Sequence, residues 1–536
     1  MTGRIVLLLV LAAASAAEAQ TRRVEILSAD VLDVTVDSLG EVQRAQGNVR
    51  MRQDTTTLWA RQVTNYVSRG EVVLSGDVQI ISGRDTLTSA TVEYDATDKT
   101  AVARGAVRLG DGESVVQAPE MTYDSRAEFA TFAGGGEIRH RGAVLSSPSG
   151  SYSSARRYAR FDGPVRLVDS TGVLTAERGT YDARVRRADF AGSVLLRRPE
   201  EALDADSLVY FRRTERARAY GRTVLQRVDG EASQRSILFA ETLLFDGQAE
   251  TASARGLPAD AAGPALDPLL LVLRTDSTGR VDSTLTRAAR IDAARQIAGA
   301  DTVTVVTAAG DVTVWERRLA ASADSARFVR QAGGDTVWLF GRRPSLWADG
   351  AQLTGDSLAV AARDGAADTL SVWGRAFAAR VDSTLGRLHQ IAGGQMRGHF
   401  QGDELRRLAV WPNAQVLYFR ATPAGLLDGA DQFSLDSLSF QFQGGELREI
   451  SGYRGIEGTS YGPSHVPGTL RLPGFAYDIE GAPTQLDVLG DTWEAGWLDR
   501  FGATFPEAEP PDAGRGQDQL PPAAPDASPA AASFGP

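Results

Sequence analysis

The chain has 536 residues, contains no cysteine and carries a formal net charge of −11 at pH 7. Without cysteine there are no disulfides, no thiolate metal ligands, no cysteine nucleophile and no lipid-anchored cysteine. Together with the N-terminal export signal, the acidic balance argues against nucleic acid as a partner.

The N-terminal segment has the pattern of a secretory signal. Its apolar run, residues 5–17, is too short to span a bilayer as a helix. A small-residue cleavage pattern follows at residues 17–19. We predict that residues 1–19 are a signal peptide cleaved near Ala19/Gln20, so that the mature protein is exported. No later stretch reaches 18 uninterrupted apolar residues, and no transmembrane helix is expected.

A repeat of 29 residues organises the first half of the chain. Tyrosine usually stands eleven residues before the repeating glycine, and alanine often stands four residues before it. Three residue types in one register predict a structural unit stacked on copies of itself, with one core along the stack. The glycines of this register are Gly47, Gly76, Gly105, Gly134, Gly163, Gly192 and Gly221.

Apolar residues stand two and four places after most of these glycines, with a polar residue between them. This period-two alternation predicts strands with one buried face, and each glycine marks a bend or bulge. Helix signals are nearly absent, so the predicted fold class is all-β. The residues predicted to face inward and to line a binding slot are Val49, Met51, Val78, Ile80, Val107, Leu109, Val165, Leu167, Val194 and Leu196.

The register loosens beyond Gly221. Residues 20–230 are predicted as the first repeat domain, and residues 231–300 as a junction or insertion with a short helix around Ala288 to Ala298. Strand patterns resume in residues 301–505, predicted as a second, diverged β domain. Residues 506–536 hold eight of the 22 prolines and are predicted to be a disordered tail.

The usual catalytic motifs are absent from the sequence. There is no G-x-S-x-G elbow, P-loop, H-E-x-x-H or S-x-x-K pattern. His389 and His399 flank a glycine pair, and we interpret them as surface or hydrogen-bonded histidines rather than as a metal pair. We expect no catalytic residue, no metal and no cofactor. A β-helix enzyme acting on polysaccharide stays open as an alternative.

Taken in order, the motifs resemble a known family. Gly47-Asn48-Val49 opens a strand, and Tyr181-Asp182 typifies the strands between. Units of the form G-x-V, turn, Leu, Ala, Tyr-Asp and A-x-x-x-G are similar to the OstA-like, LptA-type family of periplasmic lipopolysaccharide transport. Residues from Gly310 onward resemble the long OstA-like variant of Bacteroidetes-type bacteria. The resemblance covers roughly residues 24–455.

The resemblance implies an elongated, open β-jelly roll (a β-taco) built from 29-residue repeats, with two consecutive stacks as one arrangement. It implies a non-enzymatic periplasmic carrier or bridge that binds the acyl chains of lipopolysaccharide (its lipid A part). Burying an alkyl chain gains about 0.8 kcal/mol per methylene, and arginines at the mouth of the slot suit lipid phosphates.

The implied partners are other bridge proteins and a second copy of the chain, added at open strand edges. Peripheral contact with inner- and outer-membrane complexes is also implied. A structural envelope scaffold remains a second alternative beside the polysaccharide-active enzyme.

Overall fold

The computed structural model describes residues 24–489, apart from residues 39, 54–55, 84, 111–113, 125, 128, 141, 154–155, 183, 230–233, 257–266, 276–280, 299–300, 332–333, 364–365, 403 and 445. The predicted signal peptide, its cleavage site and the predicted tail lie outside the described residues. Within them, no helix is long and apolar enough to cross a membrane.

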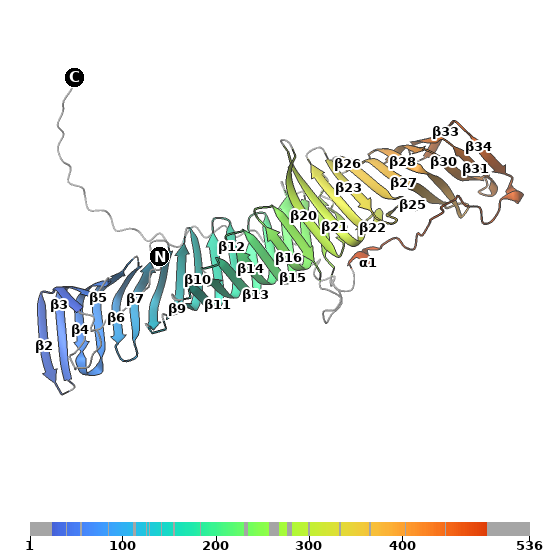
Figure 1. Ribbon diagram of the computed structural model, residues 1–536. Helices are drawn as coiled ribbons and strands as arrows, with labels where there is room; N and C mark the ends of the chain where they lie inside the picture. Colours follow the sequence, from blue (N-terminus) through green and yellow to red (C-terminus); the bar gives the residue numbers. More distant parts are fainter. Residues whose placement is uncertain are drawn as a thin grey trace, which may run out of the picture.

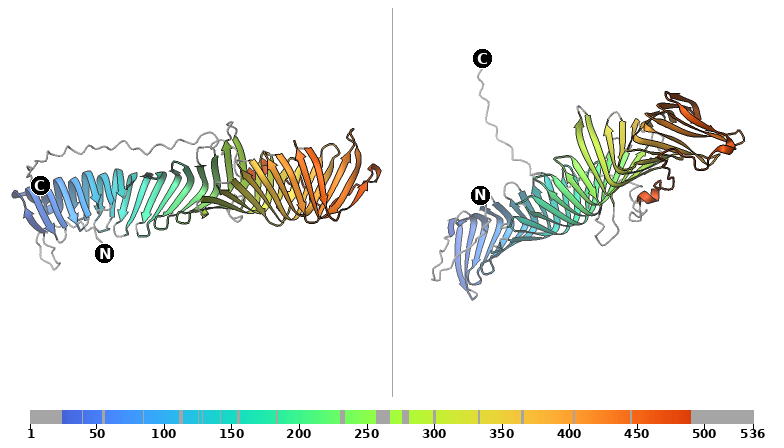
Figure 2. Two further views of the ribbon diagram at one scale, coloured as in Figure 1. Left: turned by 90° about the horizontal axis from the view of Figure 1, so that it is seen from above. Right: turned by 45° about the vertical axis from the view of Figure 1, so that its right-hand side comes forward.

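The described chain forms one long, twisted stack of antiparallel strands (Figures 1 and 2). This confirms the all-β, elongated architecture predicted from the repeats. From β3 to β16 each strand pairs with the next one along the chain. These strands, with the two edge strands that precede them, are β1 (Val24–Ser28), β2 (Val31–Asp37), β3 (Gly40–Gln53), β4 (Thr56–Tyr66), β5 (Glu71–Ser82), β6 (Asp85–Asp95), β7 (Thr100–Gly110), β8 (Ser114–Asp124), β9 (Phe129–His140), β10 (Ala143–Ser153), β11 (Tyr158–Asp169), β12 (Gly172–Asp182), β13 (Arg187–Arg197), β14 (Glu201–Phe211), β15 (Arg216–Asp229) and β16 (Gln234–Asp246).

The repeating glycine bends its strand through a bulge, as predicted. Gly105 has φ +82° and the next residue, Ala106, has φ +46°. The pairing register shifts at this point, between Arg104 and Val107. Glycine is needed because L side chains rarely adopt this left-handed conformation. An added Cβ at Gly105 would also lie 2.5 Å from the Cβ of Ala90 on the neighbouring strand.

Because every strand bends at the same place, the sheet folds into two legs that face each other. We call the leg with the tyrosine register the tyrosine leg, which includes Tyr94 and Tyr123. The leg beyond the bend, with Leu87 and Leu109, is the leucine leg. At the end of each leg away from the bend, a row of turns joins successive strands. The side of the folded sheet opposite the bend lies between these two rows of turns, and we call it the open side.

In the second half several bent strands are replaced by separate strands, one in each leg. Thus β16 pairs with one strand in the tyrosine leg and with another in the leucine leg. The remaining strands are β17 (Thr251–Arg255), β18 (Leu269–Thr275), β19 (Val281–Arg287), β20 (Arg290–Ala298), β21 (Asp301–Glu316), β22 (Leu319–Gln331), β23 (Gly334–Phe340), β24 (Ser345–Ala348), β25 (Ala351–Thr354), β26 (Ser357–Arg363), β27 (Ala366–Asp382), β28 (Arg387–Gln401), β29 (Glu404–Trp411), β30 (Ala414–Ala421), β31 (Leu427–Leu435), β32 (Ser437–Gln443), β33 (Glu446–Tyr453) and β34 (Glu457–Tyr461).

The short helix predicted around Ala288 to Ala298 is wrong. This segment forms β20, which pairs with both β17 and β21. Its small and polar residues carry no strong strand preference, so the two flanking strands decide its conformation. Hydrogen-bonded pairing therefore continues through the predicted junction, while the division of the chain into two domains stays a prediction.

One apolar core runs the length of the stack. At the inner face of the tyrosine leg, large and small residues alternate across strands. Phe132, Phe161 and Phe190 pair with Gly150 and Gly179, which lie between them. An added Cβ at Gly150 would lie 2.6 Å from the ring of Phe132, so the ring occupies the space that a side chain would need.

The segment after β34 runs back along the outside of the second half (Figures 1 and 2). We call residues 462–489 the strap; it contains the short 3₁₀ helix η2 (Pro463–His465) and ends in α1 (Gln485–Leu489). The buried side chain of Gln390 accepts a hydrogen bond from the backbone N–H of Leu472 (2.9 Å), and that of Gln352 accepts one from Asp478 (2.6 Å). At its end, Val488 packs into an apolar cluster on the outer face of β15, β16, β18 and β19.

Candidate functional site

A continuous aliphatic ladder lines the inner face of the leucine leg. Each member is the direct cross-strand neighbour of the next, because the repeat places an aliphatic residue at the same height on every strand. In the first half the ladder consists of Met51, Leu58, Ile80, Leu87, Leu109, Val116, Ile138, Leu145, Leu167, Leu174, Leu196, Leu203, Leu225, Leu238 and Leu270.

The ten residues predicted to line a slot all lie on the inner side of the leucine leg. The residues that stand two positions after the glycine lie deepest, beside the bend, and are at most 1 % exposed: Val49, Val78, Val107, Val165 and Val194. Those four places after it belong to the aliphatic ladder. Among these, Met51 and Ile80 are buried, whereas Leu109, Leu167 and Leu196 are half-buried against the core.

The ladder is therefore closed near the N-terminal end and more accessible further along. The side chains of Met51, Leu58 and Ile80 are each 3 % exposed. From Leu87 onward most members are only partly buried, although Leu174 and Leu203 remain covered. The accessible stretch lies farther from the bend than the valine row, so it is the part of the inner wall that a guest molecule would reach first.

The opposite wall shows the same gradient. In the tyrosine register Tyr94 is 1 % exposed, Tyr123, Tyr152 and Tyr181 are half-buried, and Tyr210 is 37 % exposed. Each of these tyrosines pairs with an alanine on the next strand, as Tyr181 does with Ala188. The small alanine leaves room beside each ring. The space between these two facing apolar walls is where the predicted binding slot would lie, and we call it the inner slot.

The ladder continues through the second half, where the 29-residue register of the sequence has loosened. Beyond Leu270 it passes a buried threonine, Thr286, and then resumes. The residues that carry it on are Val314, Ala321, Leu346, Leu353, Ala378, Ile391, Val416 and Phe433. The sequence hid this continuity because the strand lengths vary here and the 29-residue spacing is lost.

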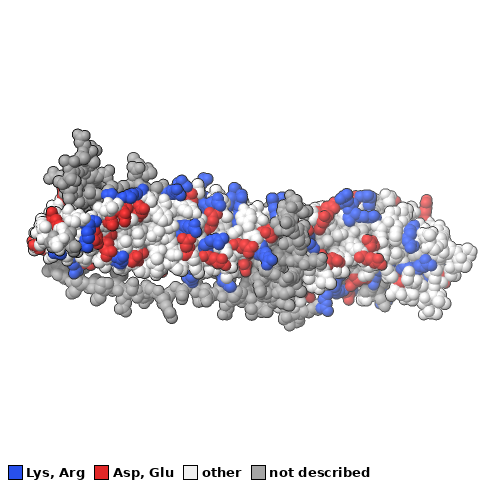
Figure 3. Space-filling view, turned by 90° about the horizontal axis from the view of Figure 1, so that it is seen from below, with Lys and Arg blue, Asp and Glu red and all other residues white. Residues whose placement is uncertain are grey.

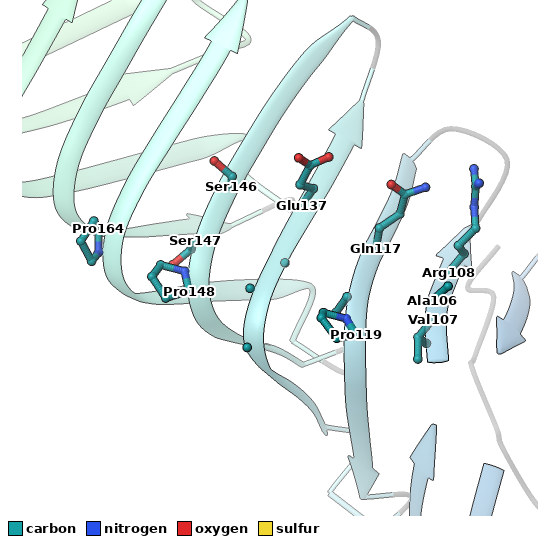
Figure 4. A pocket seen from close by; sticks show the side chains of 14 residues that line it. Ala106, Val107, Arg108, Gln117, Pro119, Glu137, Ser146, Ser147, Pro148 and Pro164 are labelled. Carbon is teal, nitrogen blue, oxygen red and sulfur yellow. The ribbon is translucent and has the colours of Figure 1, made fainter. Parts of the chain in front are cut away.

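A separate hollow of about 830 Å³ lies at the bend of β7–β11 (Figure 4). Its lining includes Arg108, Gln117 and Glu137, whose side chains alternate with inward residues and so belong to the outer face. Pro119 and Pro148 border it at the bend. Val107, at the bend, is the one residue of the predicted site that also lines this hollow.

His389 is hydrogen-bonded, as interpreted from the sequence. Its Nδ1 accepts the backbone N–H of Phe419 (3.2 Å), which leaves Nε2–H to donate to the carboxylate of Asp382 (3.2 Å). Burial lowers the pKa of His389, although Asp382 opposes the shift. His399 lies on the other leg, beyond the bend of β28. Among the described residues, no group of three or more His, Cys, Asp or Glu side chains is arranged to hold a metal ion.

Both ends of the stack present strand edges. At the first end, β1 and β2 each pair with β3 and with no other strand of the described residues. There Leu32, Val34 and Val36 are 59 %, 58 % and 78 % exposed. At the other end, β33 pairs with β32 and β34 with β31, and neither has a second partner in the part of the chain that the structure describes. Ile450 is 45 % exposed there. The space-filling view from below shows charges of both signs mixed along the molecule and thinning toward this second end (Figure 3).

The fold and the inner slot define a class: an elongated β-jelly-roll protein with an apolar interior along its length. Residues 21–177 match the model of the OstA-like protein family. This stretch of the chain is therefore similar to the OstA-like family, which confirms the resemblance seen in its motifs. The resemblance of the second half to the long variant stays a prediction.

Among solved structures, the chain is similar to LptH of Pseudomonas aeruginosa, described as the LptA-homologous periplasmic component of the lipopolysaccharide transport device. The two are 14 % identical, and the match covers 20 % of this chain and 82 % of LptH with a TM-score of 0.19. A similarity with so low a TM-score supports no conclusion about the fold or function of this chain. A search of curated proteins found no match.

Proposed function

We propose that this protein is a non-enzymatic periplasmic carrier or bridge that binds the acyl chains of lipopolysaccharide in the inner slot. The aliphatic ladder is the observation that carries the proposal. It offers an uninterrupted apolar wall along much of the stack, as a chain-shaped guest requires, whereas a compact substrate would need only one pocket. Each methylene transferred from water to this wall contributes about 0.8 kcal/mol.

The family match of residues 21–177 supports the same function, because the resemblance to OstA-like proteins implies periplasmic lipopolysaccharide transport. The open ends support the role of a bridge. A partner of the same fold would add its edge strand to β1–β2 or to β33–β34 and thereby extend both legs and the slot between them. Other bridge proteins, or a second copy of this chain, are the partners proposed.

Site-specific photocrosslinking tests the binding of acyl chains. A photoreactive residue at Leu109, Leu167 or Leu196 should crosslink to labelled lipopolysaccharide, because these half-buried positions line the accessible part of the slot. The adjacent outward positions Arg108 and Arg166 serve as matched controls in the same strands. We expect at least tenfold more adduct from the inward set.

The deep valine row provides a second comparison. Val49, Val78 and Val107 should crosslink less than Leu109, since they lie at the bottom of the slot. Equal labelling of inward and outward positions, or no labelling at any of them, would contradict the proposed carrier function. Release of reducing ends from a polysaccharide by the purified protein would favour the alternative of an enzyme.

A further inference from the structure

The turns of the tyrosine leg carry an unusual set of arginines. Three successive turns join β10 to β11, β12 to β13 and β14 to β15, and each holds two arginines. Of these six, Arg184 pairs with Asp182 (3.0 Å). The guanidinium groups of the other five are exposed and form no ion pair within the described part of the chain. We call these five the basic rim: Arg156, Arg157, Arg186, Arg212 and Arg213.

The basic residues in the earlier turns of the same leg contact neighbouring groups. Arg69 stacks on the ring of Tyr66 at 4.1 Å and lies 3.8 Å from Glu71. Arg126 donates to the backbone carbonyl of Thr97 in the preceding turn. Among the described turns of this leg from β4 to β15, the arginines whose guanidinium groups contact no other group are therefore concentrated on β10–β15.

The facing edge of the molecule differs. In the leucine leg, the turn between β11 and β12 holds Ser170 and Thr171, which are uncharged. The next turn holds Arg198, whose guanidinium lies 3.5 Å from Glu201. Among the described residues of these two turns, no arginine is left without an ion pair. At these two turns, the described residues of the leucine-leg edge thus lack the unpaired arginines of the basic rim.

The basic rim is placed beside the accessible part of the slot. Each of its turns follows a tyrosine of the opposite wall by two residues, and these tyrosines, Tyr152, Tyr181 and Tyr210, are all partly exposed. Neighbouring strands are about 4.8 Å apart, so turns of one leg recur at roughly 10 Å and three turns span roughly 20 Å. A row of guanidinium groups at this spacing, next to an apolar slot, suits an amphiphile with more than one anionic group.

We propose that the basic rim binds the phosphate groups of the amphiphile whose acyl chains lie in the inner slot. The inference rests on the proposed carrier function and adds where the head group is held. Arginine is suited to this task because its planar fork donates two parallel hydrogen bonds to phosphate. The rim would also fix the orientation of the cargo, with its head group over the tyrosine-leg edge of β10–β15.

The test removes one charge from each turn in the full mature chain. The rim variant is Arg157→Asn, Arg186→Asn and Arg213→Gln. Asparagine is used at the first two positions because both have φ +53°, which asparagine tolerates better than most residues. The matched control, Arg178→Gln with Arg218→Gln and Arg255→Gln, loses the same charge from exposed arginines on the outer face of the same leg.

Binding of fluorescent lipopolysaccharide is measured by anisotropy, with the phosphorylated form and an enzymatically dephosphorylated form. The rim variant should bind the phosphorylated form at least tenfold more weakly than the wild type and the dephosphorylated form equally well. The control should match the wild type for both forms. The affinity of the wild type for the phosphorylated form should also fall with added salt.

The contrary outcomes separate the two proposals. If the wild type binds both forms equally, or the rim variant binds like the control, the basic rim is overturned while the carrier function stands. If the wild type binds neither form, the carrier function fails and the rim proposal fails with it. Full displacement of labelled lipopolysaccharide by millimolar inorganic phosphate would indicate a site for free phosphate and would contradict a site for the amphiphile.

Discussion

At each bend, glycine meets two separate requirements, one of conformation and one of space. Gly105 and Gly134 share the conformation, with φ +82° and +81°. They differ in surroundings, because an added Cβ at Gly105 would lie 2.5 Å from the Cβ of Ala90, whereas nothing lies within 4 Å of one at Gly134. The pair therefore separates backbone strain from steric overlap.

We predict that Gly105→Ala destabilises the protein more than Gly134→Ala does. In both variants the free energy of unfolding falls by about 1–2 kcal/mol because alanine is strained in the left-handed region. In Gly105→Ala it falls by about 1–3 kcal/mol more because of the overlap with Ala90. Thermal unfolding of the two variants beside the wild type measures the difference. Equal shifts in Tm would mean that Ala90 moves aside without cost.

His389 should make the stability depend on pH. Its Nδ1 must stay unprotonated to accept the N–H of Phe419, and burial holds the pKa below the ordinary 6.5. A lowered pKa in the folded state means that the unfolded chain binds the proton more readily, so stability is lost as pH falls below about 6.5. The pKa of Asp382 is also lowered from 3.8, mainly by backbone hydrogen bonds, so protonation of this carboxylate affects stability only at a lower pH.

The measurement compares denaturant midpoints of the wild type and His389→Gln at pH 7.5 and pH 5. The wild type should lose more stability across this interval than the variant, in which no group titrates at position 389. An identical pH dependence in the two proteins would contradict the assignment of this effect to His389.

At the scale of elements, α1 depends on contacts outside the helix itself. It has only five residues, too few to be stable alone, and it is held by Val488 and Leu489, which are 0 % and 8 % exposed. Arg287 adds one hydrogen bond to the backbone carbonyl of Asp487 (3.3 Å). The docked position of α1 therefore depends on burial of two side chains in the outer apolar cluster.

Val488→Asp should detach α1, because an unpaired carboxylate in this cluster is costly. Leu486→Asp is the matched control, since Leu486 lies on the same helix and is 78 % exposed. Hydrogen exchange of residues 472–489 measures the effect: protection should fall at least tenfold in the first variant and stay unchanged in the second. Retained protection in Val488→Asp would show that the buried glutamines alone hold the strap.

At the scale of the whole molecule, the open ends allow the slot to continue into a partner. Leu32, Val34 and Val36 alternate along β2 and lie on the same face as Ala45 of the core, since Leu32 pairs with Ala45. These three side chains form an exposed apolar edge at the first end of the stack, away from the accessible part of the ladder that begins at Leu87. In the proposed bridge they would be covered by the edge strand of the next protein.

Val34→Arg with Val36→Arg should therefore abolish end-to-end association and leave cargo binding intact. Sedimentation velocity at increasing protein concentration would detect association of the wild type and its loss in the variant, while anisotropy with lipopolysaccharide checks the slot. An outward control on the same strand is Thr35→Arg. Association that survives in Val34→Arg with Val36→Arg would exclude this edge as the contact.

The sequence by itself determined the repeat, the all-β class, the bends and the inward rows. It could do so because glycine at a left-handed position, period-two alternation and a strict 29-residue spacing are local signals. The family match of residues 21–177 agrees with that interpretation. The same local reasoning failed at Ala288 to Ala298, where pairing with β17 and β21 overrode a weak preference.

Only the tertiary structure decided how far the ladder extends, which of its residues stay accessible, and where the strap lies. These depend on cross-strand neighbours far apart in the chain, such as Gln390 and Leu472. The sequence also does not show which charged side chains form ion pairs. The arginines of the basic rim resemble many others in this arginine-rich sequence. They are distinguished by the lack of an ion pair and by their position beside the slot, which spacing in the sequence does not encode.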